Sequence, residues 1–417
     1  MHRFDREVQD RLHNLKEALA KTDLPASRSD VNNHIHTIFS FSPYSPSEAV
    51  FRSVTAGLAT AGIMDHDSVS GLREFAAAGR IAGLPVTGGA EVRASFLKTP
   101  FAGHRINNTD QDGNAYIALH GIAEPYIDQV DAFLAPLRVK RNYRNSRMCE
   151  RINQKVGRYG ITLDFEKDVM PLSQYKAGGS ITERHLLYAL AGKLIDSFGP
   201  GEKLIDFIEN ALGISVTNKA KTQLSDPENP IIQYDILAAL KSDMGFFYIP
   251  ADEECADIRD IIKLSKDTNS IAAYAYLGDV EVSVTGDKRA QRFEDSYLDE
   301  FFDYLKEIGI SAVTYMPSRN TQAQLKRVRK LCSDYGFMQI SGEDINNPRQ
   351  EFVCKALRNP EYANLADSSW ALIGHEHEVQ KGLEYGFFGE KTVNTYRDID
   401  QRTRAFANIA KNIYKTK

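Results

Sequence analysis

The sequence of 417 residues contains few cysteines and no long apolar run. Its four cysteines are scattered without a CxxC spacing, which argues against a structural zinc knuckle and against a disulfide-built scaffold. No uncharged apolar stretch is long enough to cross a bilayer, and the charged amino-terminal residues lack the apolar segment of a secretory signal. We therefore expect a cytoplasmic protein that does not use a membrane. The sequence leaves the oligomeric state open.

The chain also lacks a strong excess of either charge and lacks a glycine-rich phosphate loop. Its formal net charge is −5, so no global basic field would attract long nucleic acid. Neither G-x-x-x-x-G-K-[ST] nor G-x-G-x-x-G occurs, which disfavours nucleotide kinases and dinucleotide-dependent dehydrogenases.

From residue 30 onward, short strand-like runs alternate with helical patterns, which predicts an α/β fold with mainly parallel strands. One helix start is well marked, because Ser45 suits the N-cap, Pro46 the first helical position and Glu48 a capping box. A polar helix is expected before the main fold. Residues 195–250 interrupt the alternation with a helical pattern, and residues 350–417 are also mostly helical.

Histidines and carboxylates recur where the apolar runs end. His34 and His36 are one residue apart, and the period of two in an extended chain places both imidazoles on one face. A chelating pair has this geometry, and so does an ordinary solvated strand face. Further candidates follow later strands: Asp65, His66, Asp67, Glu91, His120, His185 and Asp344. Because the carboxyl ends of parallel strands form one rim, we expect these groups to meet there, where imidazole and carboxylate together suit zinc, manganese or iron.

The ordered motifs resemble those of the polymerase and histidinol phosphatase (PHP) family of metal-dependent phosphoesterases. They are H-I-H-T (34–37), M-D-H-D (64–67), G-A-E-V (89–92), L-H-G-I (119–122), I-T-E-R-H (181–185), A-Y-L-G-D (275–279) and S-G-E-D-I-N (341–346). The resemblance implies a distorted, TIM-like (β/α)7 barrel over residues 29–194 and 251–349. Around it we expect an N-terminal helix (1–28), a helical insertion (195–250) and a C-terminal helical extension (350–417).

The resemblance also implies a ligand set for several ions. One ion would be held by His34, His36, Glu91 and Asp344. A second ion would be held by His120 and His185, with Glu91 as the bridging carboxylate. His66 would belong to a third ion and, like Asp65, is a candidate catalytic residue.

The sequence departs from the family pattern at three places, and two of the three ligands expected for the third ion are thereby missing. Phe41 and Ser42 stand where the family usually has Asp or His, Tyr276 and Leu277 replace its His-Pro, and Asn346 replaces its last histidine. Because Ser and Asn are weaker ligands than imidazole for zinc-like ions, we expect two divalent ions (Zn, Mn or Fe) and an absent or weak third. Asp65, Asp67 or Glu343 could compensate.

Arginines are the candidate substrate groups. Arg184 and Arg319 follow predicted strands and suit bidentate phosphate binding. Arg144 belongs to a basic helical stripe with Lys140, Arg147 and Arg151, which is either a solvated face or a phosphate-facing patch. A second H-x-H, at His375 and His377, is interpreted as surface residues, with the alternative that it reaches over the barrel mouth.

These patterns predict a hydrolase of phosphate esters, acting on small phosphomonoesters or nucleotides through a metal-activated water at a binuclear site. Arg184 would stabilise the developing charge. Two alternatives stay open at this point: an exonuclease on short oligonucleotides, and a catalytically degenerate protein that binds a metal or ligand. The expected partner is a small phosphorylated substrate, and long nucleic acid is disfavoured.

Overall fold

The structure is a computed structural model that describes residues 8–280 and 291–415. Its centre is one curled sheet in which seven strands follow the order β1-β2-β3-β4-β6-β7-β8 and β5 pairs with β3. Strand β4 runs antiparallel to both of its neighbours, and the other pairs are parallel. The strands are β1 (Asp30–Ile35), β2 (Leu58–His66), β3 (Val86–Ser95), β4 (Asn114–His120), β5 (Ala256–Asp257), β6 (Ile271–Ala275), β7 (Ala312–Thr314) and β8 (Met338–Ile340).

The sheet curls like a TIM-type barrel, in agreement with the expected distorted, TIM-like arrangement, but it does not close. The first strand meets the segment after β8 through a single parallel bridge, Ile35 to Ile345. Beside this bridge, the side-chain amides of Asn32 and Asn33 donate to the carbonyls of Glu343 and Ser341 at 3.1 and 2.8 Å. Side chains thus take the place of a regular ladder at the seam.

Helices cover the convex face of the sheet, and their apolar residues form the largest core cluster. These helices are α2 (Pro46–Thr55), α3 (Leu72–Ala82), α9 (Ile258–Thr268), α10 (Leu298–Ile308) and α11 (Gln322–Tyr335). The predicted N-cap is confirmed, because the Ser45 side chain accepts from the Glu48 N–H. The predicted N-terminal helix is α1 (Val8–Ala20), which packs on α2 and α3; residues 1–7 lie outside the described residues.

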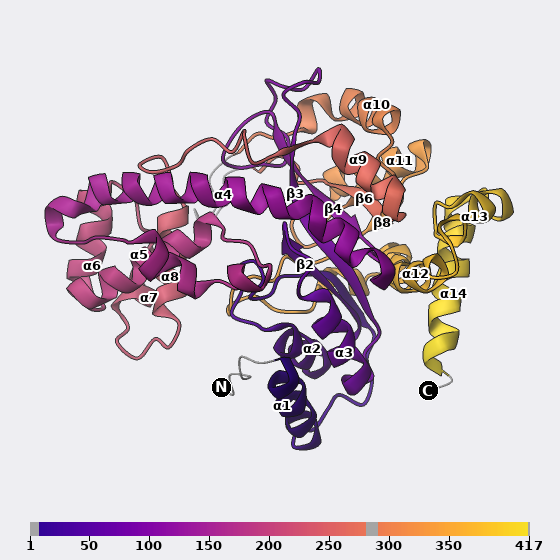
Figure 1. The fold of residues 1–417 in the computed structure, drawn as a ribbon, viewed down its shortest axis with the longest axis horizontal. Coiled ribbons are helices and arrows are strands. Elements are labelled where there is room, and N and C mark those ends of the chain that lie inside the picture. Colours follow the sequence, from indigo (N-terminus) through magenta and orange to yellow (C-terminus); the bar gives the residue numbers. More distant parts are fainter. Residues whose placement is uncertain (1–7, 281–290, 416–417) are drawn as a thin grey trace.

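A helical subdomain projects from the sheet on the side away from the C-terminal helices (Figure 1). It contains α5 (Glu183–Phe198), α6 (Glu202–Asp206), α7 (Asn218–Ser225) and α8 (Ile232–Lys241), and the long α4 (Ile127–Val156) joins it to the sheet. Its own apolar cluster includes Met148 and Ile152 of α4 as well as residues up to Phe247. The compact unit therefore begins before the predicted insertion of 195–250.

The C-terminal segment is part of the barrel core. It forms α12 (Ala363–Val379), α13 (Glu390–Thr395) and α14 (Ile399–Lys415). Leu372 and Phe406 from this segment pack with Met64 and Ala118 of the sheet. Helix α12 meets the edge where β3 begins, because the Thr87 hydroxyl and the Gly88 N–H donate to Glu376 at 2.5 and 2.7 Å.

The surface interpretation of the second H-x-H is wrong for His375, which is fully buried. Its Nε2 lies 3.2 Å from the Gly121 carbonyl and its Nδ1 accepts the Phe387 N–H at 2.9 Å, so both ring nitrogens are used. Burial lowers the pKa of His375 to about 4, which keeps the ring neutral. His377 is exposed, as expected.

None of the helices in the described parts of the chain is both long enough and apolar enough to cross a membrane.

Candidate metal centre and its cavity

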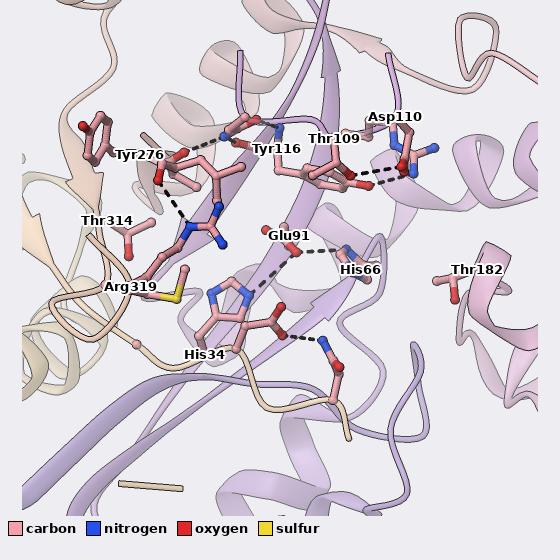
Figure 2. A pocket seen from close by; sticks show the side chains of 18 of the residues that line it. His34, His66, Glu91, Thr109, Asp110, Tyr116, Thr182, Tyr276, Thr314 and Arg319 are labelled. Carbon is pink, nitrogen blue, oxygen red and sulfur yellow. Dashed lines mark hydrogen bonds and ion pairs between the residues drawn. The ribbon is translucent and has the colours of Figure 1, made fainter. Parts of the chain in front are cut away.

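Strands β1, β2 and β3 bring three histidines and a glutamate to one edge of the sheet. His34 lies in β1, His66 ends β2, and Glu91 of β3 is the register partner of His66. His36 directly follows β1. The donor atoms of His34, His36 and Glu91 all lie within 4.8 Å of one another, and these three residues are buried. Figure 2 shows Glu91 between His34 and His66.

The imidazoles converge on a single carboxylate oxygen. Glu91 Oε2 lies 3.0 Å from His66 Nδ1, 3.7 Å from His34 Nε2 and 4.0 Å from His36 Nε2. Burial alone would raise the pKa of Glu91, but the charges of His66 and His34 hold it well below its usual range. Glu91 is therefore a carboxylate at neutral pH.

Asp344 adds a second carboxylate from the loop after β8. Its Oδ1 lies 3.1 Å from His36 Nε2 and accepts a hydrogen bond from Asn346 Nδ2 at 2.7 Å. The Asp344 side chain keeps 45% of its surface exposed, so the carboxylate remains open to the cavity beside it.

The donor set fits a divalent ion. Among the described residues, the buried atoms His36 Nε2, His66 Nδ1 and His120 Nε2 have no hydrogen-bond partner of good geometry, although the first two lie 3.1 and 3.0 Å from carboxylate oxygens of Asp344 and Glu91. Buried polar atoms in proteins are nearly always satisfied, so unsatisfied imidazole nitrogens beside a carboxylate indicate a missing ligand. Imidazole nitrogens and carboxylate oxygens are the donors that zinc, manganese and iron accept.

The two histidines expected at a second ion lie outside this donor cluster. His120 ends β4 opposite Gly89, and burial lowers its pKa to about 3, so the ring is neutral. His185 is in the first turn of α5, where its Nδ1 accepts the Thr182 N–H at 3.0 Å. Only its Nε2 remains for an ion. Among the described residues, the structure therefore assembles one donor cluster, and the second ion stays a prediction.

The residues that replace expected third-ion ligands have other contacts. Phe41 is buried in the cluster of the helical subdomain, with its ring 5.0 Å from that of His185. Ser42 Oγ accepts the Tyr44 N–H at 3.3 Å, and the Tyr276 hydroxyl donates to Asp295 at 2.6 Å. Asn346 donates to Asp344, as described above.

Asp65 lies beside the site without entering it. It is fully buried, and its carboxylate accepts the Thr37 N–H at 2.7 Å, the Thr37 hydroxyl at 2.6 Å and the Ser40 hydroxyl at 2.6 Å. These contacts fix the turn that follows β1. The geometry therefore assigns Asp65 to holding that turn and gives no support to a catalytic role.

The donor cluster opens into a cavity of about 380 Å³. The predicted substrate arginines Arg184 and Arg319 both line it. The charge of Arg184 acts on the Asp344 carboxylate, and Arg319 Nε donates to the Leu277 carbonyl at 3.3 Å. Neither arginine has a carboxylate within ion-pair distance in the described part of the chain, and burial lowers the pKa of Arg319.

Arg144 does not reach the cavity as a free cation, which corrects its expected substrate role. It is buried, and it forms ion pairs with Glu183 and with Glu254, the latter at 2.5 Å. Arg93 and Arg141 belong to the same network, because both pair with Glu254, at 2.6 and 3.1 Å. We call these five residues the arginine cluster.

Two arginines of the arginine cluster, Arg93 and Arg141, line the cavity and were missed in the sequence. Arg93 lies two residues after Glu91, so the alternation of β3 places both on one face, and this signal was available. Arg141 precedes Arg144 by three residues on α4 and also pairs with Asp67 at 2.7 Å. No sequence signal showed which face of α4 would be buried.

Comparisons with known proteins support the fold. No protein-family model matches the chain. No curated protein matches it either. Several chains of solved structures are similar, including the following two. One, from Bifidobacterium adolescentis, is provisionally named a metal-dependent phosphoesterase; it is 19% identical, with a TM-score of 0.51 over 81% of this chain and 96% of its own. The other, an amidohydrolase from Chromobacterium violaceum with bound sulfate and no metal, is 17% identical, with a TM-score of 0.50 over 80% and 96%. The chain shares the fold of these two proteins.

Proposed function

We propose that this protein is a metal-dependent hydrolase of phosphate esters, of the PHP type, that acts on small phosphomonoesters or nucleotides. One observation carries the proposal: in the part of the chain that the structure describes, buried imidazole nitrogens without hydrogen-bond partners and two arginines without ion pairs line or adjoin the same cavity. The names of the two similar structures agree with a hydrolase, and the sulfate in one of them is a tetrahedral dianion like phosphate.

A divalent ion would be held by His34, His36, Glu91 and Asp344. His66 lies beside Glu91 Oε2 and adjoins this site. Such an ion supplies Lewis-acid polarisation of a phosphoryl oxygen and lowers the pKa of a bound water. Glu91, with its low pKa, supplies negative charge that holds the ion at neutral pH.

Arg184 and Arg319 would bind the phosphoryl oxygens and stabilise the charge that develops on them. Neither guanidinium group has an ion pair with a carboxylate among residues 8–280 and 291–415, so no such pair has to break when an anion enters. The cavity volume of about 380 Å³ suits a small molecule. This volume favours a phosphomonoester over an oligonucleotide.

The test is a substrate panel with added Mn²⁺ or Zn²⁺. It contains p-nitrophenyl phosphate, nucleoside monophosphates, a short 5′-phosphorylated oligonucleotide and an N-acyl amino acid. We expect metal-dependent release of phosphate from the monoesters. Stepwise shortening of the oligonucleotide would favour the exonuclease, cleavage of the N-acyl amino acid would favour an amidase, and metal binding without any turnover would favour the degenerate protein.

The arginine assignment has a matched control in the chain. Arg184→Met should raise KM for phosphomonoesters about tenfold, because a charge-assisted hydrogen bond is worth about 1.5–3 kcal/mol. Arg147→Met is the control, since Arg147 stacks on Tyr143 on the outer face of α4. Equal KM values for the two variants would contradict the role of Arg184.

A further inference from the structure

The helical subdomain contacts the loop that carries Asp344, a residue of the metal centre. Arg349 Nε and one terminal nitrogen donate to the two carboxylate oxygens of Asp235, each at 2.6 Å. Arg349 belongs to the loop after β8, and Asp235 lies in the first turn of α8. A bidentate arginine–carboxylate pair fixes orientation as well as distance.

Hydrogen bonds connect Arg349 to the ligand carboxylate. The Arg349 N–H donates to Asn347 Oδ1 at 2.9 Å, and the N–H groups of Asn347 and Asn346 donate to Gln350 Oε1 at 2.8 and 2.7 Å. Asn346 then donates from its side chain to Asp344 Oδ1 at 2.7 Å. These hydrogen bonds connect Arg349 to Asp344 through Asn347, Gln350 and Asn346.

The other end of the contact is anchored inside the helical subdomain. Asp235 keeps only 5% of its surface exposed. Its Oδ2 also accepts from Asn229 Nδ2 at 2.7 Å, and Asn229 Oδ1 accepts the Ile231 N–H at 3.1 Å. A buried carboxylate needs such partners, because leaving its charge unpaired in the interior is costly.

We infer that Arg349 and Asp235 are positioning residues for Asp344, so that the helical subdomain holds one ligand of the metal centre in place. The inference rests on the proposed metal site. It gives the helical subdomain a role that its own apolar core does not explain. Groups that orient a metal ligand typically contribute about 10–100-fold to metal affinity.

The test measures the Mn²⁺ dissociation constant of the full chain by equilibrium dialysis with elemental analysis. Arg349→Met and Asp235→Asn should each weaken Mn²⁺ binding about tenfold. The double variant should be no weaker than either single variant, because both remove the same contact. Arg349→Lys, which keeps the charge but loses the bidentate geometry, should restore part of the affinity.

The control is a second bidentate pair of similar burial. Arg358 donates to both oxygens of Asp30 at 3.0 and 2.8 Å, at the start of β1. Arg358→Met should leave the Mn²⁺ dissociation constant unchanged. The inference is overturned if Arg349→Met and Asp235→Asn bind Mn²⁺ as tightly as the wild type, or if Arg358→Met weakens binding equally.

Wild-type behaviour separates this inference from the proposed function. If the wild-type chain binds no Mn²⁺ and hydrolyses no ester, the proposed function fails and the inference fails with it. If the wild type binds Mn²⁺ and the Arg349 and Asp235 variants match it, only the inference fails. Thermal unfolding of each metal-free variant identifies any loss of the fold, and Asp235→Asn, which removes the buried charge instead of leaving it unpaired, keeps the test valid if Arg349→Met does not fold.

Discussion

Two groups of buried charged residues meet at β3, where Arg93 belongs to one and Glu91 to the other, and they are satisfied in opposite ways. In the arginine cluster, Arg93, Arg141 and Arg144 find their partners within the chain, in Glu183 and Glu254. In the donor cluster around Glu91, imidazole nitrogens remain without hydrogen-bond partners. The comparison indicates that the first group holds the molecule together and that the second is arranged for something that binds to it.

The largest expected effect comes from breaking the arginine cluster. Glu254 accepts from three buried arginines, so Glu254→Gln leaves them with too little negative charge. We expect a loss of about 3–5 kcal/mol in the free energy of unfolding, measured by urea denaturation without metal. Glu361→Gln, which removes the half-exposed partner of Arg329, should cost less than about 1 kcal/mol. Similar losses of unfolding free energy in Glu254→Gln and Glu361→Gln would contradict the structural role of the arginine cluster.

Replacing the central carboxylate of the donor cluster should have a large effect on metal affinity and a smaller effect on stability. Glu91→Gln is expected to weaken Mn²⁺ binding about 100-fold, which corresponds to about 2.7 kcal/mol. It should lower the stability of the metal-free protein less than Glu254→Gln does. The buried Glu74→Gln, which affects the pair with Arg11, serves as the control with normal metal affinity. Unchanged metal affinity in Glu91→Gln would contradict the assignment of the site.

Glu376 represents a third way to bury a carboxyl group, with no cation within ion-pair distance in the described residues. Burial raises its pKa from 4.5 to about 8, against the opposing hydrogen bonds from Thr87 and Gly88. A raised pKa means that the folded state retains this proton. The contribution to stability is therefore complete below about pH 4.5 and is lost as the pH rises to about 8.

Glu376→Gln has no such proton to lose, and its amide oxygen can accept the same two hydrogen bonds. Relative to the wild type, the variant should gain stability as the pH rises from 5 to 8, as measured by urea unfolding at both values. A constant difference between the two proteins across this interval would show that Glu376 titrates normally.

The smallest expected effect concerns salt. The arginine cluster is neutralised internally, which leaves Arg184 and Arg319 as the cavity's arginines without ion pairs among the described residues. KM for a phosphomonoester should therefore change less than about threefold between 50 and 200 mM salt, whereas 6–10 phosphate contacts to nucleic acid would lose about 10³–10⁵ in affinity. A steep dependence would favour the oligonucleotide alternative.

The alternation of strands and helices was enough to predict the α/β sheet and the meeting of His34, His36 and Glu91. Parallel strands bring their carboxyl ends together whatever the details of packing, so this part of the site follows from local patterns. The role of Arg144 could not be predicted in this way. Helical spacing identifies a stripe of basic residues, but only the packing of α4 against Glu183 and Glu254 shows that this position faces inward.

The sequence patterns also could not predict that the barrel stays open or that the C-terminal segment packs on the sheet. Closure depends on how β1 meets the loop after β8, a contact between residues about 310 positions apart that side-chain amides complete. His375 looked like a surface residue because it lies past the last barrel motif, where the sequence pattern indicates the start of a helix. Its burial follows from the docking of α12 on the sheet, which no local pattern encodes.

The docking of Phe406 beneath the sheet has a consequence for biosynthesis. The ribosome synthesises Met64 and Ala118 long before Phe406. Until Phe406 is added, the apolar surface that it covers on these two residues stays exposed. Apolar surface exposed in this way is prone to aggregation. Completion of this core is thus a late event in the synthesis of the chain.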